Sequence, residues 1–349
     1  MKKKTIAIIF GGCSSEYEVS LQSAYSVIIS LNLEYYDVIL IGITRWGVWM
    51  RYDGSPEQIR DNTWMDIGAC VPAIISPDRH IHGMLEFYDN KIIATRIDVV
   101  FPVLHGKNGE DGTVQGLLMM AGIPFVGCDT LSSAMCMDKD IAHKIVHLAG
   151  VKTPPSILLR SKISDAELME RIVPLKFPMF VKPVSGGSSL GITKVSQESE
   201  LQGAIAVAFQ YDNKILIEEA INGFEVGCAV LGNDSLTIGE VDEIELSNGF
   251  NDYIEKYTPK TSQIHMPARI DADMAVRIKR TSVIIYQALR CSGFARVDLF
   301  LTPDRDIIFN EVNTIPGFTS HSRYPNMLKG IGMTFDKIVD SLIMLEMRR

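Results

Sequence analysis

Residues 180–193 read Phe-Val-Lys-Pro-Val-Ser-Gly-Gly-Ser-Ser-Leu-Gly-Ile-Thr. An apolar strand runs into glycines and serines, and a second short strand, residues 191–195, follows, which predicts a hairpin. Lys182 lies inside the first strand, where an unpaired ammonium group is costly, so it needs an anionic partner such as a phosphate. Backbone N–H groups of the glycines and serines would bind phosphate oxygens. A flap over a nucleotide and an ordinary flexible hairpin explain this segment about equally well.

Other nucleotide-binding motifs fit the chain less well. The segment lacks the Gly-Lys-Ser/Thr ending of a Walker A loop, and a strand follows it instead of a helix. Gly11 and Gly12 follow the first predicted strand, but the GxGxxG fingerprint of a dinucleotide site is absent. The sequence therefore argues against a P-loop enzyme and against a dehydrogenase.

Two strands near the C-terminus carry polar side chains at alternate positions. Arg296 and Asp298 would share one face of the first strand, and Glu311 and Asn313 one face of the second. Two carboxylates and an amide oxygen are suitable ligands for magnesium, whose shell substrate phosphates would complete. Arg296 would neutralise an anion that develops beside them. The alternative, a solvated strand face, is weakened by the apolar residues on either side.

The order of predicted elements indicates an α/β protein with α+β character in its C-terminal part. Up to residue 127, buried strands alternate with helices, which predicts a parallel βαβ sheet with helices on both faces. Ser14 or Ser15 would cap the first helix, with Glu18 as the capping-box partner. The predicted strands in this part are Thr5–Phe10, Val38–Ile43 and Val99–Leu104, and Thr113–Ala121 is a predicted helix.

After residue 127 the pattern changes to strands joined by glycine-containing turns, which predicts antiparallel sheets. We predict three domains, residues 1–127, 128–219 and 220–349. The predicted helices are 132–148 and 272–289, and the predicted strands are 179–183, 191–195, 214–219, 226–231, 294–301 and 306–312.

Composition excludes several classes of protein. The 349 residues have a formal net charge of −8 and no basic stripe, so a nucleic-acid partner is not expected. The six cysteines show no CxxC spacing, which fits reduced thiols of a cytoplasmic protein. The apolar run after the N-terminal lysines is too short for a signal peptide, and no run reaches ~18 residues, so no membrane span is expected.

Two histidine pairs resemble metal ligands only in their spacing. His143 and His147 stand four residues apart on a predicted helix, but no third ligand is evident, so we assign them to the helix surface. His80 and His82 lie in a predicted turn and receive the same interpretation.

Together with further motifs, these patterns indicate a resemblance to one protein family. The chain resembles the D-alanine–D-alanine ligases, which have the ATP-grasp fold, and the motifs occur in the family's order over nearly the whole chain. They are Gly-Gly-Cys-Ser-Ser-Glu-Tyr-Glu-Val-Ser (11–20), His-Gly-Lys-Asn-Gly-Glu-Asp-Gly-Thr-Val-Gln-Gly (105–116), Met-Asp-Lys (137–139), the hairpin at 180–193, Glu-Lys-Tyr (255–257), Ala-Arg-Val-Asp (295–298) and Asn-Glu-Val-Asn-Thr-Ile-Pro-Gly-Phe-Thr-Ser-His-Ser (310–322).

The resemblance implies that ATP binds between the central and C-terminal domains. Lys139 and Lys182 would contact its phosphates, Ser188 and Ser189 would belong to the closing flap, and Glu218 and Glu225 would hold adenine and ribose. Lys256 and Tyr257 would close the site over the γ-phosphate. The other expected ATP-binding residues are Glu219, Ile221 and Asn310. Asp298, Glu311 and Asn313 would bind two Mg²⁺ ions, for which Mn²⁺ could substitute.

The resemblance also implies roles toward the amino acids, and it implies a homodimer. Glu16 would hold the ammonium of the first substrate and would be linked by hydrogen bonds to Ser188 and Tyr257. His105 would lie near the first substrate, and Phe250 near the second. Arg296 and the Gly317 N–H would stabilise the tetrahedral intermediate, and Ser322 would bind the carboxylate of the second substrate.

Arg323 departs from the common pattern of the family. D-alanine-adding members tend to have a bulky apolar residue there, whereas a guanidinium would favour a substrate with a hydroxyl group. The Lys256-Tyr257 pair that lactate-adding members lack is intact, so the chain resembles the VanG-type D-alanine–D-serine ligases of vancomycin resistance. Arg323 could instead pair with a surface acid. An ordinary D-alanine–D-alanine ligase is the alternative, and a non-catalytic nucleotide-binding module is less favoured.

Overall fold

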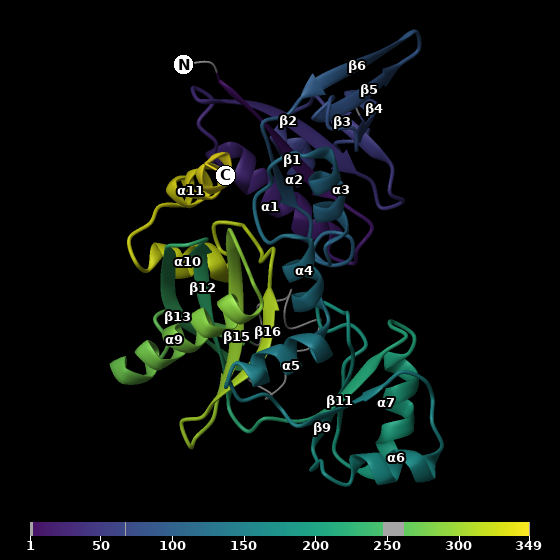
Figure 1. The fold of residues 1–349 in the computed structure, drawn as a ribbon, viewed down its shortest axis with the longest axis vertical. Helices are drawn as coiled ribbons and strands as arrows, with labels where there is room; N and C mark the ends of the chain where they lie inside the picture. Colours follow the sequence, from purple (N-terminus) through teal and green to yellow (C-terminus); the bar gives the residue numbers. More distant parts are fainter. Residues whose placement is uncertain (1–2, 67, 247–261, 349) are drawn as a thin grey trace.

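The computed structural model describes residues 3–66, 68–246 and 262–348. Three sheets lie one after another along the chain, the first at the top of Figure 1 and the other two below it. Their strands fall within residues 4–103, 156–219 and 224–313. The predicted domain boundaries at 127 and 219 stay predictions.

The N-terminal sheet has the strand order β6-β5-β4-β3-β2-β1-β7. As predicted, β1 (Lys4–Gly11) is parallel to both β2 (Tyr36–Ile43) and β7 (Val99–Val103). An antiparallel extension that the sequence did not suggest continues the sheet beyond β2. It comprises β3 (Trp49–Tyr52), β4 (Cys70–Ile75), β5 (Gly83–Tyr88) and β6 (Lys91–Arg96), with α2 (Pro56–Arg60) between β3 and β4.

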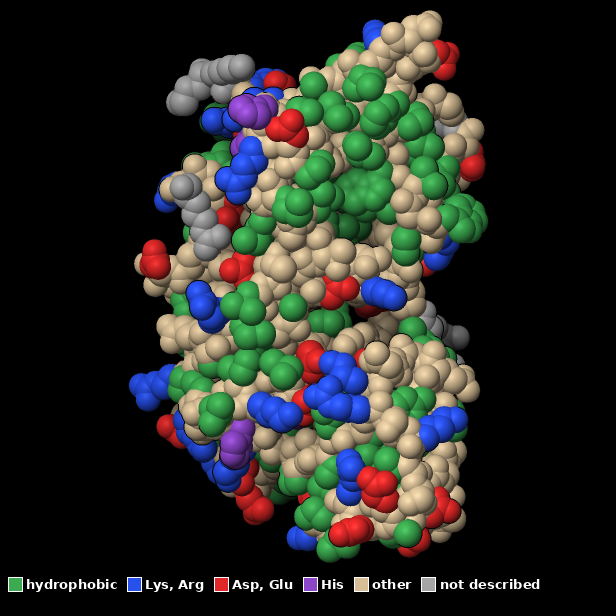
Figure 2. Space-filling view, turned by 45° about the vertical axis from the view of Figure 1, so that its right-hand side comes forward, with side chains coloured by type: hydrophobic (Ala, Val, Ile, Leu, Met, Phe, Trp, Pro, Cys, Tyr) green, Lys and Arg blue, Asp and Glu red, His purple; other side chains and the backbone are tan. Residues whose placement is uncertain are grey.

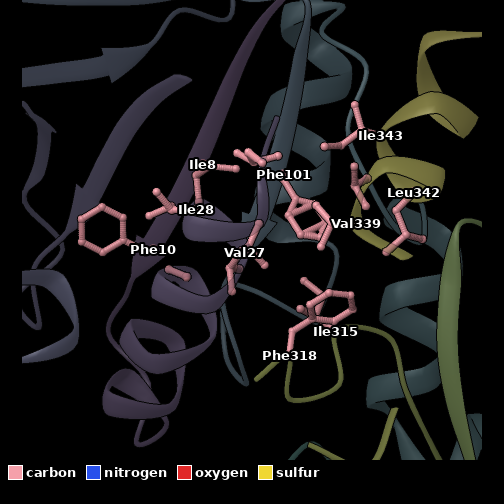
Figure 3. Close-up of a cluster of buried hydrophobic side chains, with 14 of the residues drawn as sticks. Ile8, Phe10, Val27, Ile28, Phe101, Ile315, Phe318, Val339, Leu342 and Ile343 are labelled. Carbon is pink, nitrogen blue, oxygen red and sulfur yellow. The ribbon is translucent and has the colours of Figure 1, made fainter. Parts of the chain in front are cut away.

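Helices cover both faces of this sheet, because alternate residues of β1 enter different cores. Ile6, Ile8 and Phe10 pack with α1 (Tyr17–Ser30) and α11 (Phe335–Met347), while Ala7 and Ile9 pack with α3 (Thr113–Ala121). Figure 3 shows the first core, where Val339, Leu342 and Ile343 of α11 lie near Phe101 of β7. The same core contains Ile315 and Phe318, which belong to a loop of the C-terminal region.

The central sheet has the order β10-β9-β11-β8 and is antiparallel, as predicted. Buried residues of α6 (Asp165–Ile172) and α7 (Leu201–Ala208) form a core with it. The strands are β8 (Ser156–Leu159), β9 (Met179–Pro183), β10 (Thr193–Val195) and β11 (Ile215–Glu219), and a short 3₁₀ helix, η1 (Glu198–Glu200), precedes α7.

The C-terminal sheet has the order β14-β13-β12-β15-β16, and its neighbouring strands are antiparallel. Its core includes buried residues of α9 (Ala272–Ala288) and of α5 (Lys139–Leu148). The strands are β12 (Phe224–Gly232), β13 (Leu236–Leu246), β14 (Ser262–His265), β15 (Phe294–Leu301) and β16 (Ile307–Asn313), and α10 (Arg323–Lys329) follows β16.

The single helix predicted over residues 132–148 is wrong, because two helices occupy this segment. The first, α4 (Thr130–Met137), ends at Asp138, whose backbone is extended. The Asp138 side chain then accepts a hydrogen bond from the Ile141 N–H and caps α5. The break places Lys139 in the first turn of a new helix.

Surface side chains are distributed unevenly. On the face shown in Figure 2, hydrophobic side chains gather over the upper part, and basic and acidic side chains lie interleaved below it. Exposed apolar residues of the N-terminal region include Trp46, Ile92 and Met120. Within the described ranges, none of the helices has the length and apolar character needed to cross a bilayer.

Candidate active site

The hairpin predicted from residues 180–193 is present between β9 and β10. Val181 pairs with Thr193, and the glycines and serines form the connection. Ser188 and Ser189 have φ angles of 55° and 58°, in the left-handed region that residues with a side chain rarely adopt. This strained connection borders two adjoining cavities, because Gly186, Gly187 and Ser188 line both of them.

The first cavity, of about 410 Å³, lies between the central and C-terminal sheets. Lys182 forms a buried ion pair with Glu218, so the anionic partner that Lys182 required is this carboxylate. Glu218 Oε2 is buried and has no hydrogen-bond partner among the described atoms, which leaves an acceptor at the cavity wall. The expected ATP-binding residues that line this cavity are Lys139, Lys182, Ser189, Glu218, Glu219, Ile221, Glu225 and Asn310.

Lys139 connects the hairpin to the C-terminal sheet. Its Nζ donates a hydrogen bond to the Gly186 carbonyl at 2.7 Å and lies 3.4 Å from Glu311 Oε2. The Lys139 side chain is only 8% exposed, and the residue lines both cavities. A cation therefore lies where the two cavities meet.

Acidic residues form a row across the C-terminal sheet. Asp242 on β13 pairs with Gly227 on β12, Gly227 pairs with Asp298 on β15, and Asp298 pairs with Glu311 on β16. Asn313 lies opposite Arg296, and its Nδ2 donates to Asp298 Oδ2 at 2.9 Å. Period-two alternation thus brings the predicted polar residues together on one face, as expected.

The donor set fits magnesium. Asp298 and Glu311 offer carboxylate oxygens from adjacent strands, and the Asn313 amide lies beside them. No group of three or more His, Cys, Asp or Glu side chains within the described ranges is arranged to hold a metal ion. Amide and substrate oxygens would therefore have to complete the shell. In the present arrangement Arg296 balances Asp298 through bonds of 2.7 and 2.8 Å.

Arg323 lies over the gap in the acidic row that Gly227 leaves. A Cβ atom at position 227 would come within 2.4 Å of Arg323 Nη2 and 2.7 Å of Asp242 Oδ1, so only glycine leaves room for this pair. Arg323 binds Asp242 through two bonds, of 2.7 and 2.8 Å, and Glu225 through one of 2.8 Å. Its Nη1 also lies 3.4 Å from Asp298 Oδ1.

The surroundings of Arg323 keep it charged. Burial alone would lower the pKa of Arg323, but the Asp242 and Asp298 carboxylates outweigh it and hold that pKa well above its usual value. The side chain is 11% exposed, and that of Asp242 is fully buried. The alternative that Arg323 pairs with a surface acid is therefore wrong, since its partners are buried acids at a cavity wall.

The second cavity, of about 450 Å³, is bounded by segments from the N-terminal, central and C-terminal parts of the chain. Gly317 and Ser322 are neighbours, because a Cβ atom on Gly317 would lie 3.2 Å from Ser322 Oγ. The expected catalytic and substrate-binding residues that line it are Glu16, His105, Ser188, Arg296, Gly317, Ser322 and Arg323. Phe250, Lys256 and Tyr257 lie outside the described residues.

Glu16 lines this cavity from the start of α1, where a different N-cap residue was predicted. The predicted cap at Ser14 or Ser15 is wrong, because α1 begins at Tyr17 and Glu16 is its N-cap residue. Ser14 Oγ instead donates to the His105 carbonyl, and Glu18 pairs with Arg45. Glu16 Oε2 lies so close to Gly106, whose φ is 70°, that a Cβ atom there would be 2.6 Å away. The predicted links from Glu16 to Ser188 and Tyr257 stay predictions.

His143 is also placed differently from the prediction. It is buried at 5% exposure, Nε2 lies 3.2 Å from the Asn310 carbonyl, and the ring packs edge-on against Phe309. The helix-surface assignment is therefore wrong for His143, because this face of α5 packs on β16. His147 is exposed, and His80 and His82 lie in a turn.

Two residues beside the second cavity, the buried Ser23 and the partly buried Glu110, received no role from the sequence. Glu110 lines the cavity and accepts hydrogen bonds from two backbone N–H groups, and Ser23 bonds to His105. Burial, followed by the nearby Glu16 carboxylate, raises the pKa of Glu110 to about 8. Glu110 belongs to the family motif at residues 105–116, and its place in that motif could have identified it as a site residue from the sequence.

Comparison with known families identifies the chain. A model of the D-ala D-ala ligase N-terminus matches residues 5–128, and a model of the C-terminus of the same family matches residues 145–344. The chain belongs to the D-alanine–D-alanine ligase family. Its three sheets accordingly form the α/β ATP-grasp fold of these ligases, and the family implies ATP and Mg²⁺ as its cofactors.

Similar proteins within the family include a resistance protein and ligases that differ in their second amino acid. The chain is 47% identical to the vancomycin B-type resistance protein VanB of Enterococcus faecalis over the full length of both. It is 44% identical to a D-alanine–D-alanine ligase of Caldicellulosiruptor bescii, covering all of this chain and 96% of that protein. The crystal structure of the VanG D-Ala:D-Ser ligase from Enterococcus faecalis has 57% identity and a TM-score of 0.92, covering 99% and 100% of the two chains.

Proposed function

We propose that this D-alanine–D-alanine ligase family member joins D-alanine to D-serine through a D-alanyl-phosphate intermediate. The observation that supports D-serine is Arg323, which lines the second cavity within a network of buried acids. The similarity to the VanG D-Ala:D-Ser ligase supports the same choice. The product would enter modified peptidoglycan precursors, as the relation to the resistance protein VanB suggests.

The first step would take place where the two cavities meet. A carboxylate is a poor electrophile, so the D-alanine carboxylate attacks the γ-phosphate of ATP and becomes a mixed anhydride. Lys139, Ser188 and Glu311 line both cavities, which supports a position for them next to the transferred group. Lys182 would contact the other phosphates from the first cavity. Positioning and charge dispersal supply most of the catalysis in such a transfer.

Bound magnesium would supply positive charge that offsets the negative charge of the phosphates. We propose two ions held by Asp298, Glu311 and Asn313, for which Mn²⁺ could substitute. These three residues lie on the strand face that borders the junction of the cavities, as Glu311 lines both.

The second step is the attack of the D-serine amine on the acyl carbon. Arg296 and the Gly317 N–H would stabilise the oxyanion that forms, because both line the second cavity. Glu16 would hold the ammonium of D-alanine, and Ser322 the carboxylate of D-serine. Ser322 Oγ already accepts a hydrogen bond from the Thr319 N–H at 3.0 Å, which orients its hydroxyl group.

Discrimination between the two amino acids depends on a polar group that only D-serine can use. An apolar pocket rejects an added hydroxyl group weakly, whereas a buried donor left unpaired by D-alanine discriminates far better. The hydrogen bonds to Asp242 and Glu225 use three of the five N–H groups of Arg323. Nη1 also lies 3.4 Å from Asp298 Oδ1, so at most two N–H groups would remain for a serine hydroxyl, directly or through a bridging water.

The ligase activity itself is tested by the dependence of ADP release on its substrates. We expect ADP and phosphate only when a D-amino acid and magnesium are both present. Turnover that persists in EDTA, or with L-alanine alone, would contradict the proposed reaction.

The D-serine assignment is tested by competition between D-serine and D-alanine, with the dipeptide products counted. Wild type should favour D-serine, and Arg323→Met should shift the ratio roughly ten- to hundredfold towards D-alanine. Gly227→Ala should shift it in the same direction with Arg323 retained, because the added Cβ would displace the guanidinium.

Two outcomes of this competition would change the assignment. A wild-type preference for D-alanine identifies an ordinary D-alanine–D-alanine ligase. An unchanged ratio in Arg323→Met removes Arg323 as the selector and directs attention to Phe250, Asp242 and Glu243. Sedimentation of the purified protein tests the homodimer, which stays a prediction.

A further inference from the structure

The loop that follows β16 is held in place by side chains of the N-terminal region. It comprises residues 314–318 and contains Gly317, the proposed oxyanion donor. Ile315 and Phe318 are 3% and 1% exposed, and both pack in the core formed by β1, β7, α1 and α11. Figure 3 shows them below Phe101 and beside Val27. The loop is therefore anchored on both sides of Gly317 in a core built mainly by other elements.

Both the N–H and the carbonyl of Ile315 form hydrogen bonds with side chains of one N-terminal segment, residues 105–110. The Ile315 N–H donates to Glu110 Oε1 at 3.0 Å, and the other Glu110 oxygen accepts from the Gly106 N–H at 2.8 Å. The Ile315 carbonyl lies 2.8 Å from His105 Nδ1. A carbonyl oxygen only accepts, so Nδ1 is the nitrogen of His105 that bears the hydrogen.

That tautomer orders the remaining bonds. With the hydrogen on Nδ1, His105 Nε2 accepts from the Ser23 hydroxyl group at 3.1 Å. The Ser23 oxygen in turn accepts from the Phe318 N–H at 3.1 Å. Burial lowers the pKa of His105, which favours the neutral ring that this chain of bonds requires. The hydrogen bonds thus run in one direction, from the Phe318 N–H through Ser23 and His105 to the Ile315 carbonyl.

These bonds fix a segment that no strand pairing supports. The strand β16 ends at Asn313, and the N–H groups of Ile315 and Phe318 are buried. A buried N–H without an acceptor is destabilising, so losing Glu110 or Ser23 as acceptor would let the loop move. Gly317 lies between the two held residues and would move with them.

We propose that Ser23, His105 and Glu110 are positioning residues that hold residues 314–318 so that the Gly317 N–H faces the carbonyl oxygen of the acyl-phosphate, where the oxyanion forms. These three side chains act by holding the loop, and they do not contact the transferred phosphoryl group in this proposal. The proposal rests on the ligase reaction and on the role of Gly317, but it does not depend on whether D-serine or D-alanine is the second substrate.

The proposal separates the two half-reactions. Formation of the acyl-phosphate uses Lys139, Lys182 and the acidic row, which lie on strands and helices that the loop does not hold. Attack of the amine needs the oxyanion donor, so loosening the loop should slow that step alone. The acyl-phosphate would then persist and be lost to water, and ADP would be released without dipeptide.

The experiment compares Ser23→Ala and Glu110→Gln with two matched controls. Ser282→Ala removes a fully buried serine hydroxyl in α9, and Glu86→Gln neutralises a buried glutamate held by Tyr88 and Thr95 in the antiparallel extension. Two rates are measured: positional isotope exchange in ATP labelled with oxygen-18 at the β–γ bridge, which reports acyl-phosphate formation, and dipeptide formation with either D-amino acid.

We expect dipeptide formation to fall roughly tenfold or more in Ser23→Ala and Glu110→Gln, with isotope exchange nearly unchanged and more than one ADP released per dipeptide. The controls should stay near the wild-type ratio of one. An equal fall in both rates, or no change in the ratio, overturns the positioning role. A wild type that makes only D-alanyl-D-alanine overturns the D-serine assignment and leaves this test intact.

Wild type alone provides a second measurement, should a variant fail to fold. The amide hydrogens of Ile315 and Phe318 should exchange as slowly as those of the core strand β1. Exchange as fast as in an exposed turn, such as that of His80, would show that the loop is not held and would overturn the proposal.

Discussion

The two cavities balance their charges in different ways. In the first, each lysine has one main carboxylate partner, Lys182 with Glu218 and Lys139 with Glu311. At the wall of the second, a single guanidinium, that of Arg323, is shared by Asp242, Glu225 and Asp298. Around Lys182 and Lys139 the charges thus form pairs, whereas around Arg323 they form one network.

This difference determines how far the effect of a substitution spreads. Removing one member of a pair leaves a single uncompensated charge, whereas removing Arg323 takes a cation from Asp242, Glu225 and Asp298 at once, of which Asp298 keeps Arg296. Glu225 is an expected nucleotide residue and Asp298 an expected magnesium ligand, so the network also connects the specificity pocket to the other cavity. Selectivity and nucleotide binding should therefore change together when Arg323 is replaced.

The largest expected effect on catalytic activity is at Glu311, which lines both cavities. Glu311→Gln should reduce ligation on the order of a hundredfold or more, about 3 kcal/mol in the barrier, because the charge on the phosphates loses a metal-binding carboxylate. Steady-state dipeptide formation measures the loss, and circular dichroism checks the fold. Glu240→Gln, on β13 and paired with Lys279 away from both cavities, is the control. Near-normal activity would remove Glu311 from the metal site.

The network predicts a loss of stability as well as of selectivity for Arg323→Met. Breaking a buried ion pair costs about 3–5 kcal/mol. Here Asp242 and Glu225 lose the Arg323 guanidinium, while Asp298 keeps that of Arg296. Adding Asp242→Asn should recover part of that loss, since it removes one of the repelling charges. Urea unfolding of wild type, both single variants and the double variant measures the coupling. Additive effects would show that the residues do not act as a network.

The smallest effect concerns pH and Glu110. Its pKa of about 8 exceeds the ordinary value of 4.5, so folding favours the protonated form. That contribution to stability is fully present below about 4.5 and is lost as pH rises through 8. Between these values the free energy of unfolding should fall relative to Glu110→Gln by at most about 1.4 kcal/mol per pH unit.

Urea titrations from pH 5 to 8 measure this slope, with Glu86→Gln as the control. The groups that face Glu110 and contribute to its titration are the carboxylates of Glu16 and Glu311. Parallel stability curves for wild type and Glu110→Gln would show that Glu110 titrates in its ordinary range.

Much of the fold could be predicted because local patterns determined it. Apolar runs ending at glycine or polar residues located β1, β7 and β15 within one residue, and alternation placed Asp298 and Glu311 on one face. The break at Asp138 was missed because helical periodicity continues through it, and only the capping role of the side chain ends the first helix. The strands β3 to β6 were missed because their burial is irregular.

The site was predicted less evenly, for a physical reason. The described site residues that line each cavity were named from motifs, yet their partners were not, because partners come from distant segments. Arg323 and Glu225 are 98 residues apart, and Glu110 and Ile315 are 205 apart. Sequence identifies a group that needs a counter-charge, as it did for Lys182. The partner, Glu218 in that case, follows only from strand pairing.

The helix α11 returns to the sheet with which the chain begins. Ile338, Val339 and Ile343 complete the core on β1, and Tyr36 donates a hydrogen bond to Asp340 across 304 residues. During synthesis, the part of this sheet face that α11 covers beside α1 must therefore stay uncovered until residue 343 has left the ribosome. At about 5–20 residues per second, that interval lasts on the order of tens of seconds. The nascent chain consequently exposes an apolar surface for most of its translation, and a chaperone has that long to bind it.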